Sequence, residues 1–508
     1  MTLPLLDLDF AAGRDEAPAI TCDGERLSYA DLRRRAAAIT ARLSTLGLRR
    51  GERFGALLVN GPNVIAFYMA CARAGVVGVP LSRRLTAAEL EFQLADSGAK
   101  AVMFSAEFAP LVAAVSDRLP LVKAWIDEAE FERSAVDAPT PAFAGSGSDG
   151  APAPDDPFCI MYTGGTTGGP KAAVQTRAGW ACCLQATVDA WQATPADRHL
   201  ISLPMSHAAW FSAGATLLAG GHVTILRTWD PLHALEAIVR ERITTLNMIP
   251  TMLGDLVKAH EQHPELPRRM HTVRLLTVAG SLLPEATYAR ATAILGPVVG
   301  NIYGLTEAAG PVTFLMPHEM RGDARNSVGR PNPFIEIAIL DDDGRPTDGS
   351  TAGEIGLAGP QVTPGYWQRP AETRAAFAGR WLKTGDMARL DELGRVWLGD
   401  RKKDMIKSGG YNVYPSEVEQ VIYRHPAVQE CAVFGMPDER WIEAVHAVVV
   451  LRPAHAGAGQ AATLADILAA CRAALAAHKV PKALHALNEL PRTRFGKFDK
   501  AAAARQLV

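Results

Sequence analysis

The feature that most constrains this chain is the stretch YTGGTTGGPK from Tyr162 to Lys171, which follows a short apolar run at 158–161. The apolar run predicts a buried strand. From Thr163 to Thr167 every residue is glycine or threonine. Glycine lets the backbone adopt positive φ and approach a ligand closely, and successive N–H groups in such a loop form a concave anion site. Three threonine hydroxyls and the Lys171 ammonium add donors and charge, so the stretch favours a polyphosphate site over a plain turn.

Two glycine patterns nearby are similar to other nucleotide-binding motifs, but each lacks a feature that its motif requires. Gly164 and Gly169 have the spacing of a P-loop, but Pro170 stands where that motif needs its lysine. The segment 145–150, GSGSDG, satisfies G-x-G-x-x-G, but no predicted strand precedes it and prolines surround it. We interpret this second segment as linker rather than as a dinucleotide site.

Composition narrows the class of protein. The 508 residues are enough for about three folding units, and a net charge of −2 gives no sign of a nucleic-acid or anionic-membrane partner. Seven cysteines without a C-x-x-C pair, and a start without a basic secretory signal, indicate a cytoplasmic protein with reduced thiols. The longest apolar run, 210–226, is interrupted by glycines and His222, so it predicts a buried helix and strand instead of a membrane span.

Strands and helices alternate from about residue 19 to residue 105, which predicts a mainly parallel sheet with helices on its faces. Ser28, with Asp31 three residues later, predicts the start of one of these helices. After residue 328 the pattern changes to hairpin strands, expected at 335–340 and 353–358, and indicates a small β-subdomain.

A dense charge cluster at 399–404 precedes a segment of roughly a hundred residues that has its own predicted helices and strands. Domain boundaries fall in such polar, exposed segments. We therefore predict an α/β protein with an N-terminal domain at 1–400 and a C-terminal domain at 401–508.

Five motifs stand in order along the chain. They are the stretch 162–171, NIYGLTE at 301–307, KTGD at 383–386, the segment 399–415, and PRTRFGK at 491–497. Together they resemble the adenylate-forming superfamily of acyl- and aryl-CoA synthetases, peptide-synthetase adenylation domains and luciferases, and most closely a bacterial-type acyl- or aryl-CoA ligase. The resemblance covers essentially the whole chain, and five motifs in this order are highly specific.

The resemblance implies a large N-terminal domain of layered α/β subdomains with a β-subdomain, and a small mobile α+β C-terminal domain. It implies ATP, Mg²⁺ and coenzyme A, with a small-molecule carboxylic acid as substrate. The acid attacks the α-phosphate of ATP to give an acyl-adenylate and pyrophosphate, and a thiol then takes the acyl group as AMP leaves. The resemblance leaves a homodimer open.

The same resemblance assigns the ATP site residue by residue. The phosphate loop would comprise Thr163, Gly164, Gly165, Thr166, Thr167 and Gly168, with Lys171 either assisting or serving as a surface charge. The adenine side of the site would comprise Gly280, Ser281, Asn301, Tyr303, Gly304 and Leu305. Thr306 would contact the α-phosphate, Glu307 would hold Mg²⁺, and Asp386 and Arg401 would bind the ribose.

Four residues near the C-terminus take further roles in the resemblance. Lys497 would be the catalytic cation, because attack by one anion on another needs a positive charge between them. Lys403 falls at the hinge position, where one or two residues absorb a large φ/ψ change. Gly409 and Gly410 would line the CoA tunnel, with a hairpin turn as the plain alternative.

Two positions depart from the family pattern. The usual Thr-Ser-Gly is Thr163-Gly164-Gly165 here, and the usual glycine after Pro-Lys is Ala172. Both changes put the rate or the ATP affinity in doubt, not the class of reaction.

The acyl pocket is expected to be apolar. Its predicted residues are His207, Trp210, Ile249, Ala279, Ala309 and Gly310. His207 would lie near the substrate carboxylate, with a purely structural histidine as an equal alternative. None of the six is lysine or arginine, which argues against a dicarboxylate such as malonate. The small Ala309 and Gly310 leave room for an aromatic, alicyclic or medium-chain acid.

Three functions compete at this stage. The first is a carboxylic acid–CoA ligase, favoured by the free-standing chain and the glycine pair at 409–410. The second is an adenylating enzyme that loads a carrier protein. The third is a non-catalytic ATP-binding regulator. The presence together of Glu307, Asp386, Arg401 and Lys497 argues against it.

Overall fold

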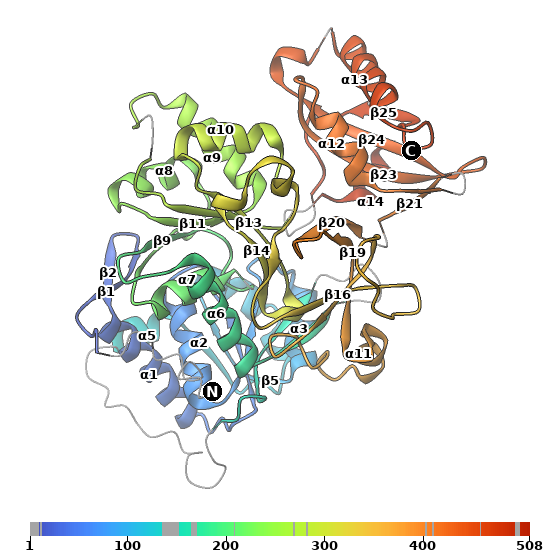
Figure 1. The fold of residues 1–508 in the computed structure, drawn as a ribbon. Coiled ribbons are helices and arrows are strands. Elements are labelled where there is room, and N and C mark those ends of the chain that lie inside the picture. Colours follow the sequence, from blue (N-terminus) through green and yellow to red (C-terminus); the bar gives the residue numbers. More distant parts are fainter. Residues whose placement is uncertain are drawn as a thin grey trace. The chain divides into compact units, whose positions relative to one another are not determined.

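The computed structural model describes residue 10 and residues 13–134, 152–163, 170–207, 209–267, 270–280, 283–401, 404–408, 411–457, 459–492 and 498–507 (Figure 1). The chain divides into two compact units. The first comprises Met1–Ile337 and Leu357–Leu382, and the second comprises Ala338–Gly356 and Lys383–Val508.

The first unit contains a six-stranded sheet with the strand order β6-β5-β3-β4-β7-β8. All neighbouring strands are parallel except β7 and β8, which are antiparallel. The strands are β3 (Arg53–Leu57), β4 (Val77–Pro80), β5 (Ala99–Phe104), β6 (Ala124–Asp127), β7 (Pro157–Thr163) and β8 (Lys171–Thr176). The predicted alternation of strand and helix is therefore confirmed in this sheet.

A nine-stranded sheet has the order β15-β14-β13-β12-β11-β9-β10-β1-β2 and is parallel from β13 to β1. Its strands are β1 (Pro18–Cys22), β2 (Glu25–Ser28), β9 (Arg198–Ile201), β10 (His222–Ile225), β11 (Thr245–Met248), β12 (Leu275–Val278), β13 (Val299–Leu305), β14 (Gly310–Leu315) and β15 (Arg330–Pro331). The run at 210–226 forms helix α7 (Trp210–Leu218) and strand β10, as predicted.

Side-chain caps mark the start of four helices of the first unit, α1 (Tyr29–Thr45), α3 (Ala87–Ser97), α6 (Arg177–Trp191) and α8 (Pro231–Arg240). Helix α1 starts with a complete capping box, in which Ser28 and Asp31 satisfy each other's backbone N–H groups. The other main helices are α2 (Pro62–Ala74), α4 (Ala109–Ala113), α5 (Ala129–Ser134), α9 (Pro250–Gln262), α10 (Glu285–Leu295) and α11 (Pro370–Ala376).

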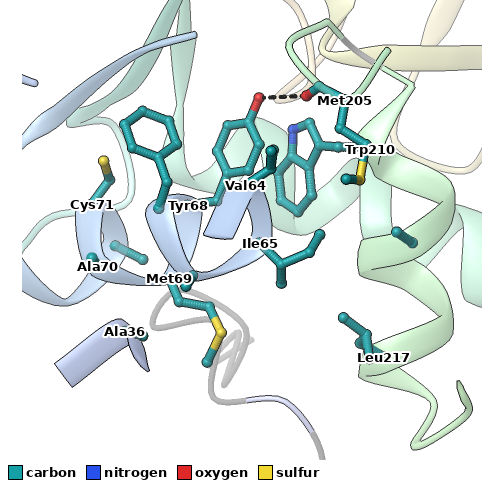
Figure 2. Packing of buried hydrophobic residues seen from close by; sticks show 14 of the residues in the cluster. Ala36, Val64, Ile65, Tyr68, Met69, Ala70, Cys71, Met205, Trp210 and Leu217 are labelled. Atoms are coloured by element: carbon teal, nitrogen blue, oxygen red, sulfur yellow. Dashed lines mark hydrogen bonds between the residues drawn. The ribbon is translucent and has the colours of Figure 1, made fainter. Parts of the chain in front are cut away.

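Aromatic side chains form the centre of the largest hydrophobic core. The Tyr68 and Trp210 rings stack with centroids 4.3 Å apart, and the Trp180 ring lies 4.4 Å from Trp210 on a tilted plane. The Tyr68 hydroxyl donates to the Met205 carbonyl at 3.0 Å, which joins α2 to the loop before α7 (Figure 2). Offset and tilted aromatic pairs of this kind stabilise a core beyond the area that they bury.

The β-subdomain predicted after residue 328 is present as a five-stranded sheet of order β16-β17-β19-β18, with β20 paired to β19. Its strands are β16 (Glu336–Leu340), β17 (Gly353–Ala358), β18 (Phe377–Ala378), β19 (Trp381–Leu390) and β20 (Val396–Arg401).

The C-terminal part of the second unit forms a sheet of order β22-β21-β24-β23, with β25 parallel to β24. Its elements are β21 (Ile406–Ser408), β22 (Tyr411–Val413), α12 (Pro415–Tyr423), β23 (Val428–Asp438), β24 (Ile442–Leu451), α13 (Gln460–Ala474), β25 (Ala483–Ala486) and α14 (Lys500–Leu507). No helix among the described residues combines the length and apolar character needed to cross a membrane.

Candidate active site

The two strands that flank the predicted phosphate loop are held together at its base. Thr163, the last residue of β7, pairs with Lys171, the first residue of β8. The Thr163 hydroxyl donates to the Lys171 carbonyl at 3.3 Å. Five of the predicted phosphate-binding residues, Gly164 to Gly168, lie outside the described residues. The structure therefore shows where this loop begins and ends.

Four adjacent parallel strands of the nine-stranded sheet direct their carboxyl ends toward the other predicted motifs. Strand β9 is followed by the segment that contains His207, the adjacent β11 by Ile249, and the next strand β12 by Ala279–Gly280. Strand β13, at the end of this series, finishes in the segment 303–307. In open α/β sheets ligands bind at this edge. Residues predicted separately for the adenine slot and the acyl pocket are thus brought to one edge of the sheet.

Contacts at this edge confirm the proximity for two of the strands. The Ala279 N–H donates to the Met248 carbonyl at 3.0 Å. A Cβ added to Gly280 would lie 3.5 Å from Ile249 Cγ2. Gly280 has φ +92°, a conformation that favours glycine. Ser281, its predicted companion, is not among the described residues.

Strand β13 carries the remaining adenine-side residues. Asn301 and Tyr303 are almost fully buried, at 8% and 9% exposure, while Leu305 is partly exposed. Asn301 Nδ2 donates to the Ser327 carbonyl at 3.5 Å. A Cβ at Gly304 would lie 2.3 Å from the Gly310 carbonyl oxygen, so the close approach of β14 requires glycine there.

Thr306 and Glu307 lie in a single 3₁₀ turn, Thr306–Ala308, whose carbonyl groups are all bound by other segments. The bonds run from Gln175 Nε2 to Thr306 O at 2.7 Å, from the Thr363 N–H to Glu307 O at 2.7 Å, and from Gln361 Nε2 to Ala308 O at 2.7 Å. Carbonyls at the end of a helical turn need such external donors. The backbone of the predicted α-phosphate and metal residues is therefore fixed by three separate donors.

The segment 361–367 lies along β8 and brings an unpredicted residue into the site. The Val174 N–H donates to the Gly365 carbonyl at 3.0 Å, and the Trp367 N–H donates to the Ala172 carbonyl at 2.8 Å. Tyr366, between these bonds, donates its hydroxyl to Glu307 Oε1 at 3.1 Å. The only sequence signal was an aromatic pair in a stretch rich in glycine and proline, which shows no helical or strand period.

The described side chains suit Mg²⁺ held largely by its substrate. No group of three or more His, Cys, Asp or Glu side chains in the described part of the chain is placed to hold a metal ion. Mg²⁺ is commonly bound by one or two carboxylates together with substrate phosphates and water. The partly exposed Glu307 carboxylate at the carboxyl edge of the sheet fits that mode of binding.

The predicted acyl residues divide into a partly exposed and a buried set. His207 is partly exposed, and burial lowers its pKa below the ordinary value. Trp210 and Ala309 are 0% and 1% exposed. A Cβ at Gly310 would lie 2.9 Å from Cys183 Sγ and 3.8 Å from Phe211 Cβ. Phe211 ends the stretch 204–211 that the resemblance assigns to the acyl site, whereas Cys183 is a neighbour of the predicted pocket that the sequence did not reveal.

The second unit carries the predicted ribose residues. Asp386 on β19 and Arg401 on β20 are paired residues of the antiparallel ladder, and Asp386 is 8% exposed. The Gly385 N–H donates to Glu354 Oε1 at 3.0 Å, and the Asp386 N–H donates to Thr384 Oγ1 at 3.1 Å.

Four predicted residues of the second unit fall outside the part of the chain that is described. They are Lys403, Gly409, Gly410 and Lys497. Arg492 and Phe498 form an antiparallel bridge, so both ends of the segment that contains Lys497 are held together.

Comparison with known proteins tests the resemblance directly. The chain matches the AMP-binding enzyme family over residues 9–367 and the AMP-binding enzyme C-terminal domain over residues 417–497. A feruloyl-CoA synthase from Amycolatopsis sp is 36% identical over 496 residues, which is 96% of this chain and 96% of that protein. The long-chain-fatty-acid–CoA ligase FadD13 of Mycobacterium tuberculosis is 34% identical over 499 residues, 95% of this chain and 93% of that protein.

A solved structure agrees with the sequence relatives. ATP-bound MatB from Rhodopseudomonas palustris superposes with a TM-score of 0.88 at 29% identity, covering 100% of this chain and 99% of that chain. The predicted fold class and family are therefore confirmed, whereas the boundary at residue 400 and the individual site roles stay predictions. The chain belongs to the AMP-binding enzyme family of adenylate-forming enzymes and is an ATP-dependent, AMP-forming acid–thiol ligase of the acyl-CoA synthetase type.

Proposed function

We propose that this ligase activates an apolar aromatic, alicyclic or medium-chain carboxylic acid and transfers it to coenzyme A. One observation carries the choice of acid. The predicted acyl residues Ile249, Ala279, Ala309 and Gly310 lie where the sheet edge meets the core, and none carries a charge. Burying a second carboxylate among them without a cationic partner would be costly. The relatives named for feruloyl and long-chain fatty acyl groups support an apolar acid.

The residues of the first unit would position ATP and the acid for the first step. The loop from Thr163 to Lys171 would bind the β- and γ-phosphates, and Thr306 would contact the α-phosphate. Glu307 would hold Mg²⁺, which neutralises phosphate charge when bound. His207, whose pKa is lowered by burial, would lie beside the carboxylate.

The second unit would supply the remaining groups. Asp386 and Arg401 would bind the ribose, and Lys497 would place its ammonium between the attacking carboxylate and the α-phosphate. The carboxylate oxygen forms a bond to phosphorus as the bond to pyrophosphate breaks. A change of φ/ψ at Lys403 would then withdraw Lys497 from the reacting groups and bring Gly409 and Gly410 to them. Beside these glycines the CoA thiol would attack the acyl carbonyl and release AMP.

A two-stage assay tests both the acid and the acceptor. The protein is incubated with ATP, Mg²⁺ and benzoate, ferulate, cyclohexanecarboxylate, octanoate or malonate, and pyrophosphate is followed with and without CoA. We expect pyrophosphate and an acyl-CoA thioester from at least one apolar acid and no turnover of malonate. Preference for malonate would contradict the proposed pocket. Pyrophosphate without thioester would indicate a carrier protein as acceptor, and neither product would indicate a regulator.

The proposal places the enzyme in the cytoplasm, where ATP and CoA are supplied together. A homodimer is a separate expectation, which sedimentation velocity of the purified protein would test.

A further inference from the structure

Tyr366 contacts charged groups from two motifs that are far apart in the sequence. Its hydroxyl donates to Glu307 Oε1 at 3.1 Å, and the Lys171 ammonium lies 5.5 Å from the centre of its ring. All three residues are partly exposed. One aromatic side chain therefore lies between the cation at the end of the phosphate loop and the carboxylate expected to hold the metal.

The backbone around Tyr366 is held in place from several sides. Its N–H donates to Thr373 Oγ1 at 3.0 Å, and the preceding Gly365 carbonyl accepts from Val174. Three residues later, Arg369 forms an ion pair with Asp96, whose carboxylate also accepts from the Tyr162 hydroxyl at 2.9 Å. Side chains can be positioned accurately when the surrounding shell is fixed in this way.

The chemistry of the phenol suits both contacts. The Tyr366 hydroxyl donates its proton to Glu307 Oε1. A donor on one carboxylate oxygen leaves the second oxygen for a monodentate bond to Mg²⁺. The ring attracts the Lys171 ammonium without supplying a counter-anion, so the positive charge stays available to phosphate.

We propose that Tyr366 is a positioning residue for the Mg²⁺–nucleotide complex, orienting the Glu307 carboxylate through its hydroxyl and the Lys171 ammonium through its ring. The inference rests on the proposed roles of Glu307 and Lys171 in the ligase reaction. Tyr366 itself transfers no proton and forms no bond to substrate.

The test uses Tyr366→Phe, which removes the hydroxyl and keeps the ring. The first readout is the Mg²⁺ concentration for half-maximal pyrophosphate release. The second is independent of turnover: the Kd of Mn²⁺ in the presence of α,β-methylene-ATP, measured by electron paramagnetic resonance. Loss of a group that orients a metal ligand typically weakens metal binding about 10- to 100-fold. We expect about a tenfold increase in both constants, and no further increase when Tyr366→Phe is added to Glu307→Gln.

The matched control is Tyr29→Phe, which also removes a hydroxyl that is bonded inside the first unit. The Tyr29 hydroxyl donates to Gly221 O at 2.6 Å and to Leu217 O at 3.1 Å, among residues with no predicted role in the site. We expect it to lower the melting temperature while leaving both metal constants unchanged. Equal metal constants in wild type and Tyr366→Phe, or equal increases in the two Phe variants, would overturn the inference.

The experiment also covers a Tyr366→Phe variant that does not fold and a wild-type protein that shows no ligase activity. If Tyr366→Phe does not fold, Tyr366→Met carries the test, because its flexible apolar side chain fills much of the same space and lacks the hydroxyl that donates to Glu307 Oε1. An unchanged Mn²⁺ Kd in that variant would overturn the inference. If wild type releases no pyrophosphate with any acid, the proposed function fails, while Mn²⁺–nucleotide binding still decides the role of Tyr366.

Discussion

The contact between Gly310 and helix α6 offers a quantitative test of packing beside the predicted acyl pocket. A Cβ at position 310 would lie 2.9 Å from Cys183 Sγ, well inside the separation of about 3.5–4.0 Å that dispersion favours for heavy atoms. Gly310 also has φ +135°, where side chains are strained. Overpacking costs about 1–3 kcal/mol and such backbone strain about 1–3 kcal/mol. We therefore expect Gly310→Ala to lower the free energy of unfolding by about 3 kcal/mol.

Cys183→Ala separates the two contributions. It removes the sulfur that the new methyl group would meet but leaves φ at position 310 unchanged. In the double variant we expect a favourable coupling of about 1–2 kcal/mol, the range typical of side chains in direct contact. Urea unfolding followed by the fluorescence of the buried Trp180 and Trp210 gives the four free energies. Gly254→Ala is the control, because an added Cβ in that position of α9 meets nothing within 4 Å.

The same variants test whether Gly310 lines the acyl site. If it does, Gly310→Ala lowers kcat/KM for a bulky acid more than for acetate, by tenfold for each 1.4 kcal/mol or so of differential binding. Additive free energies, within about 0.5 kcal/mol, would refute the contact with Cys183. An unchanged ranking of acids would refute the placement of the pocket.

Three further predictions concern other parts of the mechanism. Lys497→Ala should abolish adenylate formation yet leave thioester formation from a supplied acyl-adenylate largely intact; equal loss of both half-reactions would contradict its role in the first step alone. Lys403→Pro should do the reverse, since proline fixes φ, and a normal overall rate would place the hinge elsewhere. Gln175→Leu should cost about 1–3 kcal/mol of unfolding free energy, because it leaves the buried Trp180 indole N–H without an acceptor and the Thr306 carbonyl with the Ala309 N–H alone, whereas Gln185→Leu on the surface of α6 should cost under about 0.5 kcal/mol.

Local elements could be predicted from the sequence because their signals are local. The capping box of Ser28 and Asp31 involves residues three apart, and strand β17 matches its predicted span 353–358. The placement of β1 beside β10 could not be predicted, because it pairs Ile20 with Val223. When two paired strands are this far apart in the sequence, their pairing depends on which arrangement of the whole chain buries the most apolar surface. No local sequence pattern indicates that arrangement.

The same distinction applies to the candidate site. Thr306 and Glu307 were recognisable because they belong to a motif of consecutive residues. Gln361 and Tyr366 act through contacts with residues distant in the sequence and belong to no periodic pattern or motif, although their donors fix the 3₁₀ turn and the Glu307 carboxylate. Supporting residues of this kind become visible only when the chain is folded.

Strand β8 shows how the departure at Ala172 bears on the reaction. Side chains two apart on a strand share a face, so Lys171 and Gln175 lie on one face and Ala172 on the other. Contacts agree with this assignment: Lys171 reaches the Tyr366 ring and Gln175 reaches Thr306, whereas Ala172 is 1% exposed within a separate core cluster that also contains Ile160. The extra methyl group of Ala172 therefore packs into the core, on the side away from the residues expected to meet the nucleotide. Ala172 therefore does not lower ATP affinity through direct contact with the nucleotide. Of the two departures from the family pattern, only Gly164 lies in the phosphate loop itself.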